Sequence, residues 1–186
     1  MSLSHKHTNG NNLRPHDVSF KRILVPVDFS ACTLETLRYA TALARPFDAV
    51  VDVLHVIQPG RNRTELSRPY PAMIRAISEG ARQELKRLVG ILQTGVGGNK
   101  FSVRVREGHA CEVILNEACS SKADLIVIGT RNRSWLSRLW RHHTVKRVIQ
   151  NSPCPVMVLR SGMKGSVVNR LRTTLFHAIS SCFTPK

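Results

Sequence analysis

The stretch Ala-Asp-Leu-Ile-Val-Ile-Gly-Thr, residues 123–130, decides the fold. After Asp124 it is an apolar run, which is typical of a parallel strand that is covered on both faces. Gly129 follows this run at the carboxyl end of the strand, where a glycine often opens a phosphate-binding loop. The next thirteen residues, Arg-Asn-Arg-Ser-Trp-Leu-Ser-Arg-Leu-Trp-Arg-His-His at 131–143, are instead rich in arginine, tryptophan and histidine.

Strand-like and helix-like segments alternate on both sides of this run. Strands are expected at 22–28, 50–57, 101–105 and 153–160, and helices at 34–44, 73–92, 113–119 and 144–150. The strand at 101–105 alternates apolar and polar residues, so it is expected to be half exposed and near a sheet edge. The alternation predicts an open parallel sheet with helices on both faces.

In such a sheet, ligands bind beyond the carboxyl ends of the strands. This rule points to Asp28, to the segment around Val56 and to Gly129. Ser30 is expected to be the N-cap of the first helix, and Pro46 to end that helix.

The bulk composition limits the class of protein. A chain of 186 residues suits one domain, and the odd number of five cysteines without a C-x-x-C pair favours a reducing cytoplasm. No signal peptide is recognisable in the polar lead-in at 1–19, which is expected to be disordered. The formal net charge is +16 and no acidic residue follows Asp124, a distribution that attracts polyanions.

Four segments resemble the universal stress protein family. They are Val-Pro-Val-Asp-Phe-Ser at 25–30, Leu-His-Val-Ile at 54–57, Asp-Leu-Ile-Val-Ile-Gly-Thr at 124–130 and Ser-Pro-Cys-Pro-Val-Met-Val-Leu-Arg at 152–160, in the family's order. The resemblance covers a domain at about 20–160. It implies an adenine-nucleotide alpha-hydrolase-like sheet with strand order 3-2-1-4-5, a role in stress adaptation, and a homodimer formed through the last strand.

One branch of that family binds ATP with a loop of the form Gly-x2-Gly-x9-Gly-Ser/Thr. Aligned on Gly129, the later loop positions fall on Asn132, His142 and His143, with Thr144 one place further. Asn132 tolerates the left-handed backbone, whereas the His142 ring fills space that a phosphate or ribose would need. Guanidinium groups bind phosphate bidentately, so three arginines are candidates to hold an anion there: Arg131, Arg133 and Arg141.

The resemblance also implies roles for residues on the first two strands. It implies that Asp28 contacts a nucleoside and that Val56 contacts adenine through its backbone; a second reading, in which Asp28 caps the following turn or helix, stays open. The candidate nucleotide site therefore comprises Pro26, Val27, Asp28, Val56, Gly129, Asn132, His143 and Thr144.

Other chemistry is not indicated. The adjacent His142 and His143 point in different directions on a helix, so no metal site is expected, and no catalytic set of side chains is recognisable from spacing. Cys154, between two prolines at a strand start, is expected to be a structural thiol. The apolar face of the loop, comprising Trp135, Leu136, Leu139 and Trp140, is expected to pack on the domain rather than to lie on a membrane.

The basic extension at 161–186 shows helical spacing of its apolar residues and is expected to dock on the domain or to self-associate. The sequence thus favours a cytoplasmic, non-catalytic regulatory stress protein with an eroded nucleotide loop and no certain cofactor. One alternative is an ATP-binding protein with weak hydrolysis. Another is a module that binds a polyanion, namely nucleic acid, an anionic membrane or an acidic protein partner.

Overall fold

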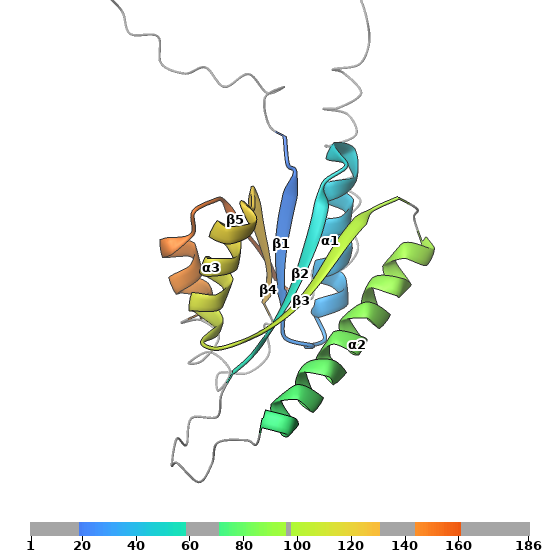
Figure 1. The fold of residues 1–186 in the computed structure, drawn as a ribbon. Helices are drawn as coiled ribbons and strands as arrows, with labels where there is room; N and C mark the ends of the chain where they lie inside the picture. The colour runs from blue at the N-terminus through green and yellow to red at the C-terminus, as the bar shows by residue number, and fades with distance from the viewer. Residues whose placement is uncertain (1–18, 59–70, 96–97, 131–143, 161–186) are drawn as a thin grey trace, which may run out of the picture.

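The computed structural model describes residues 19–58, 71–95, 98–130 and 144–160. Its centre is a parallel sheet in the order β3-β2-β1-β4-β5 (Figure 1), which confirms the predicted fold class and strand order. The strands are β1 (Arg22–Val27), β2 (Val50–Ile57), β3 (Lys100–Glu107), β4 (Leu125–Thr130) and β5 (Val156–Arg160). The strand that alternates apolar and polar residues, β3, lies at one edge of the sheet as expected, and β5 lies at the other.

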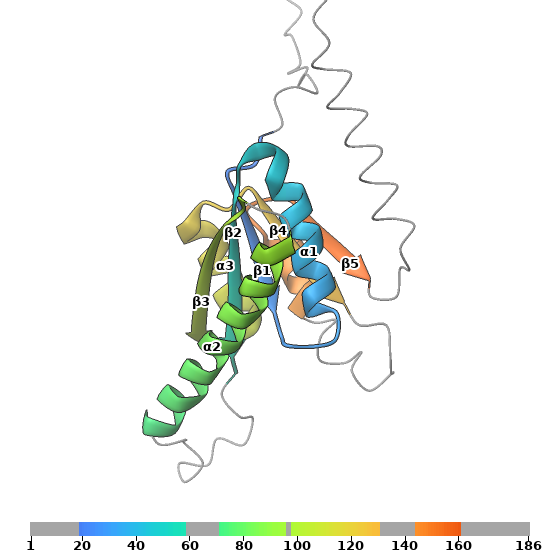
Figure 2. The ribbon, with the colours of Figure 1, turned by 90° about the vertical axis from the view of Figure 1, so that its right-hand side faces the viewer.

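Helices cover both faces of this sheet. They are α1 (Thr33–Ala44), followed by a 3-10 turn η2 (Arg45–Phe47), α2 (Pro71–Gly95), α3 (Ala110–Ser121) and a helix at 144–151. Figures 1 and 2 show α1 and α2 on one side of the sheet and α3 on the other. The crossovers that carry α1 and α2 step from β1 to β2 and on to β3, whereas the crossover that carries α3 steps back from β3 to β4. Right-handed crossovers that run in opposite directions along a sheet leave their helices on opposite faces.

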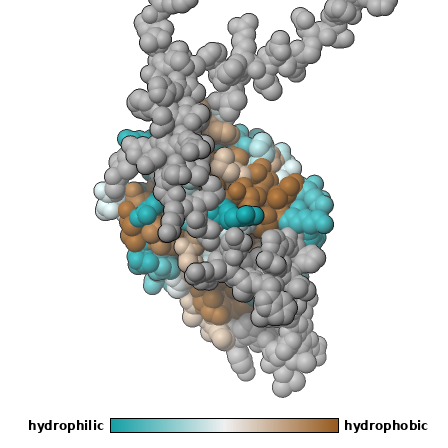
Figure 3. All heavy atoms as spheres, turned by 180° about the vertical axis from the view of Figure 1, so that it is seen from behind, coloured by the Kyte–Doolittle hydropathy of each residue, from teal (hydrophilic) through white to brown (hydrophobic). Residues whose placement is uncertain are grey.

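The two-sided burial of the central strands matches their apolar sequences. Ile23 and Val25 of β1 pack in the core on the α1 and α2 side, whereas Leu24 packs in the core on the α3 side. The strand β4 divides in the same way, with Val127 on the first side and Ile126 on the second. Apolar surface reaches the outside in separate patches that are bordered by hydrophilic residues (Figure 3).

β1 and β4 pair only over a short length. Their register contains Ile23 with Leu125 and Leu24 with Ile126, although both strands continue. The junction is fixed at its amino end, where the Asp124 carboxylate accepts hydrogen bonds from the backbone N–H of Lys21 at 2.7 Å and of Arg22 at 2.9 Å. β1 and β4 therefore leave their ladder before their carboxyl ends, and the point at which the strand order reverses lies between them.

The start of α1 differs from the sequence prediction. Ser30 is not the N-cap: the helix begins at Thr33, Cys32 is the N-cap residue, and Cys32 makes no side-chain capping bond. The Ser30 N–H donates to Asp28 Oδ1 at 3.0 Å, and the Ser30 carbonyl accepts from the Thr33 N–H at 2.9 Å. Ser30 is thus part of a turn that Asp28 closes, which removes it from the capping position.

Three predicted segments lie outside the described residues: the lead-in, the tryptophan- and arginine-rich loop, and the basic extension. Within the described part of the chain, no helix is long and apolar enough to cross a membrane.

Candidate functional site

The turn after β1 sits at the carboxyl edge of the sheet, next to the point where the strand order reverses. Pro26 and Val27 end the strand, and Asp28 follows as an exposed residue whose carboxylate holds the turn through the Ser30 N–H. Phe29 adopts a left-handed backbone with φ of 54°. A bulky residue rarely takes this conformation, so the surrounding contacts must hold it.

An aromatic contact stabilises the left-handed conformation of Phe29. The Phe29 ring lies against the His55 ring of β2, with centroids 4.4 Å apart and planes tilted by 39°. His55 in turn places its Nδ1 2.9 Å from the Val27 carbonyl oxygen, beside the same turn. The position of the turn that carries Asp28 is therefore tied to the end of β2.

The end of β2 reaches beyond β1. Even-numbered residues of β2 direct their backbone polar groups toward β1, as the hydrogen bond from the Val50 N–H to the Lys21 carbonyl at 2.9 Å shows. The β1–β2 register ends at Val27 with His55, whereas the β2–β3 register continues to Ile57 with Glu107. The Val56 carbonyl therefore points past the end of β1, toward the turn that carries Asp28.

Gly129 is required by packing against α1. A Cβ at this position would lie 2.1 Å from Thr36 Oγ1 and 3.4 Å from Cys32 Sγ. The Thr36 hydroxyl is held in place because it donates to the Cys32 carbonyl at 2.8 Å. Gly129 thus lets the end of β4 approach the first turns of α1, a role that the sequence did not suggest.

Six of the eight residues predicted to bind a nucleotide lie in the described part of the chain, at the ends of β1, β2 and β4 and at the start of the last helix. Pro26 and Val27 are the last residues of β1, Asp28 begins the turn that follows, and Val56 follows His55, the residue that pairs with Val27. Gly129 lies against α1, and Thr144 opens the helix at 144–151. The remaining predicted contacts fall outside the described residues; they are Asn132, His143, Arg131, Arg133 and Arg141.

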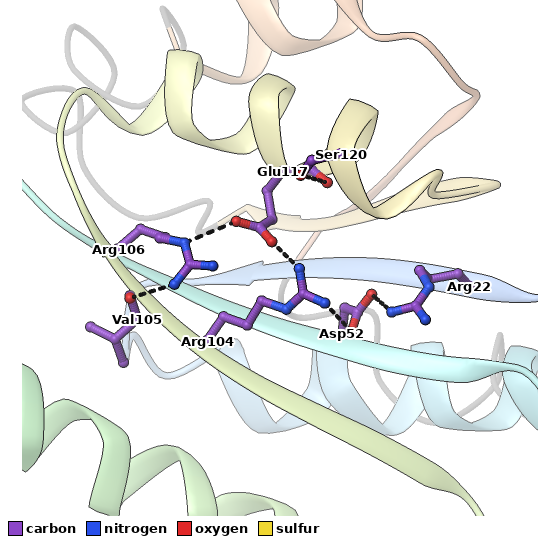
Figure 4. A network of polar contacts seen from close by, with 7 residues as sticks. All are labelled: Arg22, Asp52, Arg104, Val105, Arg106, Glu117 and Ser120. Carbon is purple, nitrogen blue, oxygen red and sulfur yellow. Dashed lines mark hydrogen bonds and ion pairs between the residues drawn. The ribbon is translucent and has the colours of Figure 1, made fainter.

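A network of ion pairs crosses the α3 side of the sheet (Figure 4). Asp52 of β2 is fully buried, accepts a hydrogen bond from Arg22 at 2.8 Å and lies 3.8 Å from the Arg104 guanidinium. Arg104 also binds the buried Glu117 of α3, which Arg106 contacts through Nε at 3.1 Å. Three cations and two anions therefore join β1, β2, β3 and α3.

The electrostatics of the network follow from these contacts. The hydrogen bond that Arg104 donates to Glu117, aided by the negative charges of Asp52 and Glu117, raises the pKa of Arg104 against the opposing effect of burial. The sequence predicts only that the strand around Arg104 is half exposed, and it does not identify Asp52 or Glu117 as partners of its arginines. The available signal was an aspartate within the apolar run of β2, because a charge in a buried strand requires a partner.

Burial also affects the cysteines. It raises the pKa of the Cys154 thiol, against a hydrogen bond from Ser152 that lowers it, and it raises the pKa of Cys111. A raised thiol pKa disfavours the reactive thiolate, which supports the structural role expected for Cys154. Among the residues that the structure describes, no group of three or more His, Cys, Asp or Glu side chains could hold a metal ion.

The family model and the curated relatives that match this chain point to the same family. The family model described as the universal stress protein family matches residues 19–160. A universal stress protein of Methanocaldococcus jannaschii is 30% identical over 163 residues, which cover 84% of this chain and 88% of that protein.

Solved structures share the fold. A universal stress protein from Archaeoglobus fulgidus in complex with dAMP has a TM-score of 0.52 at 23% identity and covers 76% of this chain and 98% of its own. A universal stress protein in complex with cAMP has a TM-score of 0.54 at 19% identity and covers 78% of this chain and all of its own. With its sheet order, its family match and its relative of 30% identity, this chain belongs to the universal stress protein family.

Proposed function

We propose that this protein is a non-catalytic regulator that binds an adenine nucleoside monophosphate at the carboxyl edge of the sheet, between the turn at Asp28 and the end of β2. The observation that supports this proposal most is the geometry of the turn after β1. The Asp28 carboxylate accepts a hydrogen bond from the Ser30 N–H, and the Val56 carbonyl points past the end of β1 toward this turn.

The nucleoside half of the site supports this proposal. A carboxylate is an acceptor for ribose hydroxyls, and a backbone carbonyl is an acceptor for the exocyclic amine of adenine. The Phe29–His55 contact fixes both groups before a ligand arrives, so little conformational entropy is lost on binding. Two relatives of the same fold were solved with dAMP and with cAMP, ligands that carry one phosphate.

The phosphate half of the site supports a monophosphate over a triphosphate. The sequence keeps Gly129 but has Asn132, His142 and His143 where the ATP loop of the family has two glycines and a hydroxyl residue. Backbone N–H groups cradle phosphates best where glycine lets the chain turn inward and approach closely. One phosphate near the start of the loop needs fewer such groups than three.

The test is calorimetric titration of the full chain with AMP, cAMP and ATP at moderate salt. We expect AMP or cAMP to bind, ATP to bind no tighter, and Asp28→Ala to weaken binding at least tenfold. Asp48→Ala is the matched control, because Asp48 is an exposed aspartate that pairs with Lys100 at the far end of β2 and β3.

The outcomes separate the alternatives. Tight ATP binding that Asp28→Ala abolishes would favour an ATP-binding protein in which Arg131, Arg133 and Arg141 replace the missing glycines. If none of the three nucleotides binds to the wild-type protein, the proposal is refuted. It would leave a regulator that acts through a partner of another kind.

A further inference from the structure

The helix α2 is long for the sheet it covers. It has 25 residues against eight in the neighbouring β3, and none of its residues before Leu85 is buried. Figures 1 and 2 show its first turns extending past the carboxyl edge of the sheet. The first half of α2 therefore owes little of its stability to the core of this domain.

Two lines of residues run along α2 with the 3-4 spacing of a heptad repeat. One faces the core and includes Leu85, Leu88 and Leu92, all of them buried. The second is displaced by one residue, or about 100° around the helix. We call it the outer seam; its members are Met73, Ile77, Gly80, Glu84, Arg87, Ile91 and Thr94.

The outer seam exposes large apolar side chains. Met73 is 58% exposed, Ile77 43% and Ile91 40%. They are three of the six exposed large hydrophobic residues in the described part of the chain, and all three lie on the same side of one helix. A Cβ at Gly80 would meet nothing within 4 Å, so this glycine is not required by any contact within the domain.

We propose that the outer seam of α2 packs against the outer seam of a second copy of this chain, in antiparallel orientation. Its charges are self-complementary: Glu84 and Arg87 form a two-bond ion pair on one helix, at 2.7 and 2.8 Å. An antiparallel two-fold arrangement sets Glu84 opposite Arg87 of the second copy, so each charge also meets an opposite charge across the contact.

The same register accommodates Ile77 and Ile91, whereas Met73 lies opposite position 98 of the second copy, beyond the end of α2. This register sets Gly80 opposite Ile91 of the second copy, so that the space left by the glycine receives a large side chain. It also sets Ile77 opposite Thr94 of the second copy, whose methyl group is apolar. A parallel arrangement in register would instead place Glu84 against Glu84 and Gly80 against Gly80, which leaves like charges together and the gap unfilled.

The outer seam is separate from the edge of β5. α2 packs against β3, and β3 and β5 are the two opposite edges of the sheet. A contact through α2 is therefore compatible with a second contact through β5, and the two can be tested independently.

The experiment measures the mass of the full chain by light scattering and sedimentation over a range of concentrations. We expect Ile91→Glu to weaken the α2 contact at least tenfold and to halve the mass of the assembly at low micromolar concentration. Ile149→Glu is the matched control, because Ile149 is an isoleucine 51% exposed on a different helix, and it should leave the mass unchanged. Val158→Glu reports on the β5 edge.

A charge exchange provides a second readout that does not depend on an apolar residue. Arg87→Glu should lower the mass, because it sets two acids together, and Glu84→Arg combined with Arg87→Glu should restore it. A monomeric wild type, a mass unchanged in Ile91→Glu, or a failure of the exchanged pair to recover what Arg87→Glu loses would each overturn the proposal.

Discussion

Gly129 belongs both to the packing of the fold and to the candidate nucleotide site. Its hydrogen takes the place of a side chain that would fall 2.1 Å from Thr36 Oγ1. A glycine at the end of a strand in this fold therefore has two separable reasons to be there, packing against α1 and access for a ligand. The first of them can be measured without any ligand.

We expect Gly129→Ala to lower the free energy of unfolding by about 1–3 kcal/mol, because Thr36 or the backbone of β4 must move. Urea denaturation measures the loss. Gly90→Ala is the control: its Cβ meets nothing within 4 Å inside α2, so we expect a gain of about 0.5–1 kcal/mol. Thr36→Ala should recover part of the loss in the Gly129→Ala background. Equal stability of Gly129→Ala and wild type would contradict the packing role.

Tyr39 gives the stability a dependence on alkaline pH. Burial raises the pKa of the Tyr39 phenol, and the Glu35 carboxylate raises it further. The folded state thus keeps this proton at a pH where the unfolded chain, titrating near about 10, has lost it. The stabilisation by neutral Tyr39 is fully present below pH ~10 and is lost as the pH rises through the folded-state pKa.

We therefore expect the urea midpoint of the wild type to fall between about pH 9 and pH 11 more steeply than that of Tyr39→Phe, which has no phenol to ionise. Each protein is compared with its own midpoint near neutral pH, so that the loss of the hydroxyl itself is subtracted. Parallel curves for the two proteins would show that Tyr39 does not contribute to the alkaline loss.

At the scale of elements, Arg104 of β3 joins β2 and α3, and Asp52 extends the network to Arg22 of β1. Arg104 lies between the buried acids Asp52 and Glu117, so its removal leaves two carboxylates in the interior with less compensation. Removal of Asp52 has a milder consequence, because the side chains of Arg22 and Arg104 are 32% and 27% exposed and can turn to water.

We expect Arg104→Met to lower the free energy of unfolding by about 3–5 kcal/mol and Asp52→Asn to lower it by less. The double variant should cost less than the sum of the two, since the charges that it removes interact. Lys100→Met is the control for an exposed pair with Asp48, with an expected effect of about 0–1 kcal/mol. If Asp52→Asn were the more damaging change, the centre of the network would be Asp52 and not Arg104.

This network also marks the limit of what the sequence could predict. The strands, their order and the presence of the helices followed from apolar periodicity and from the family resemblance, because both are local or inherited patterns. The network depends on register: Arg104 pairs with Leu54, so its side chain reaches Asp52 two residues away on the same face. No pattern within one segment encodes such an offset between strands.

The start of α1 shows a second limit, between neighbouring residues. A serine before an apolar repeat is a sound capping signal, but Asp28 binds the Ser30 N–H first and draws Ser30 into its turn. The sequence reading of Asp28 as a turn-capping residue is confirmed, while its contact with a nucleoside stays a prediction. The contacts expected from Asn132, His143 and the three loop arginines also stay predictions.

At the scale of the whole molecule, charge opposes compactness. The chain carries 28 lysines and arginines against 12 acids, and a net charge of +16 repels itself. Salt shortens the range of this repulsion, with a Debye length of about 30 Å at 0.01 M and about 8 Å at 0.15 M. The ion pairs of the buried Asp52 and Glu117 are screened much less by salt than exposed pairs are.

We therefore expect the urea midpoint of the full chain at neutral pH to rise as sodium chloride increases from about 0.01 M to about 0.15 M. Lys86→Glu provides the control, since Lys86 is exposed on α2 outside the outer seam and the change lowers the net charge from +16 to +14. Its midpoint should rise less steeply with salt. A midpoint that fell with added salt would mean that exposed attractive pairs outweigh the net repulsion. A midpoint that rises with salt, and rises more steeply in the wild type than in Lys86→Glu, would show instead that the net positive charge of this protein destabilises its folded state.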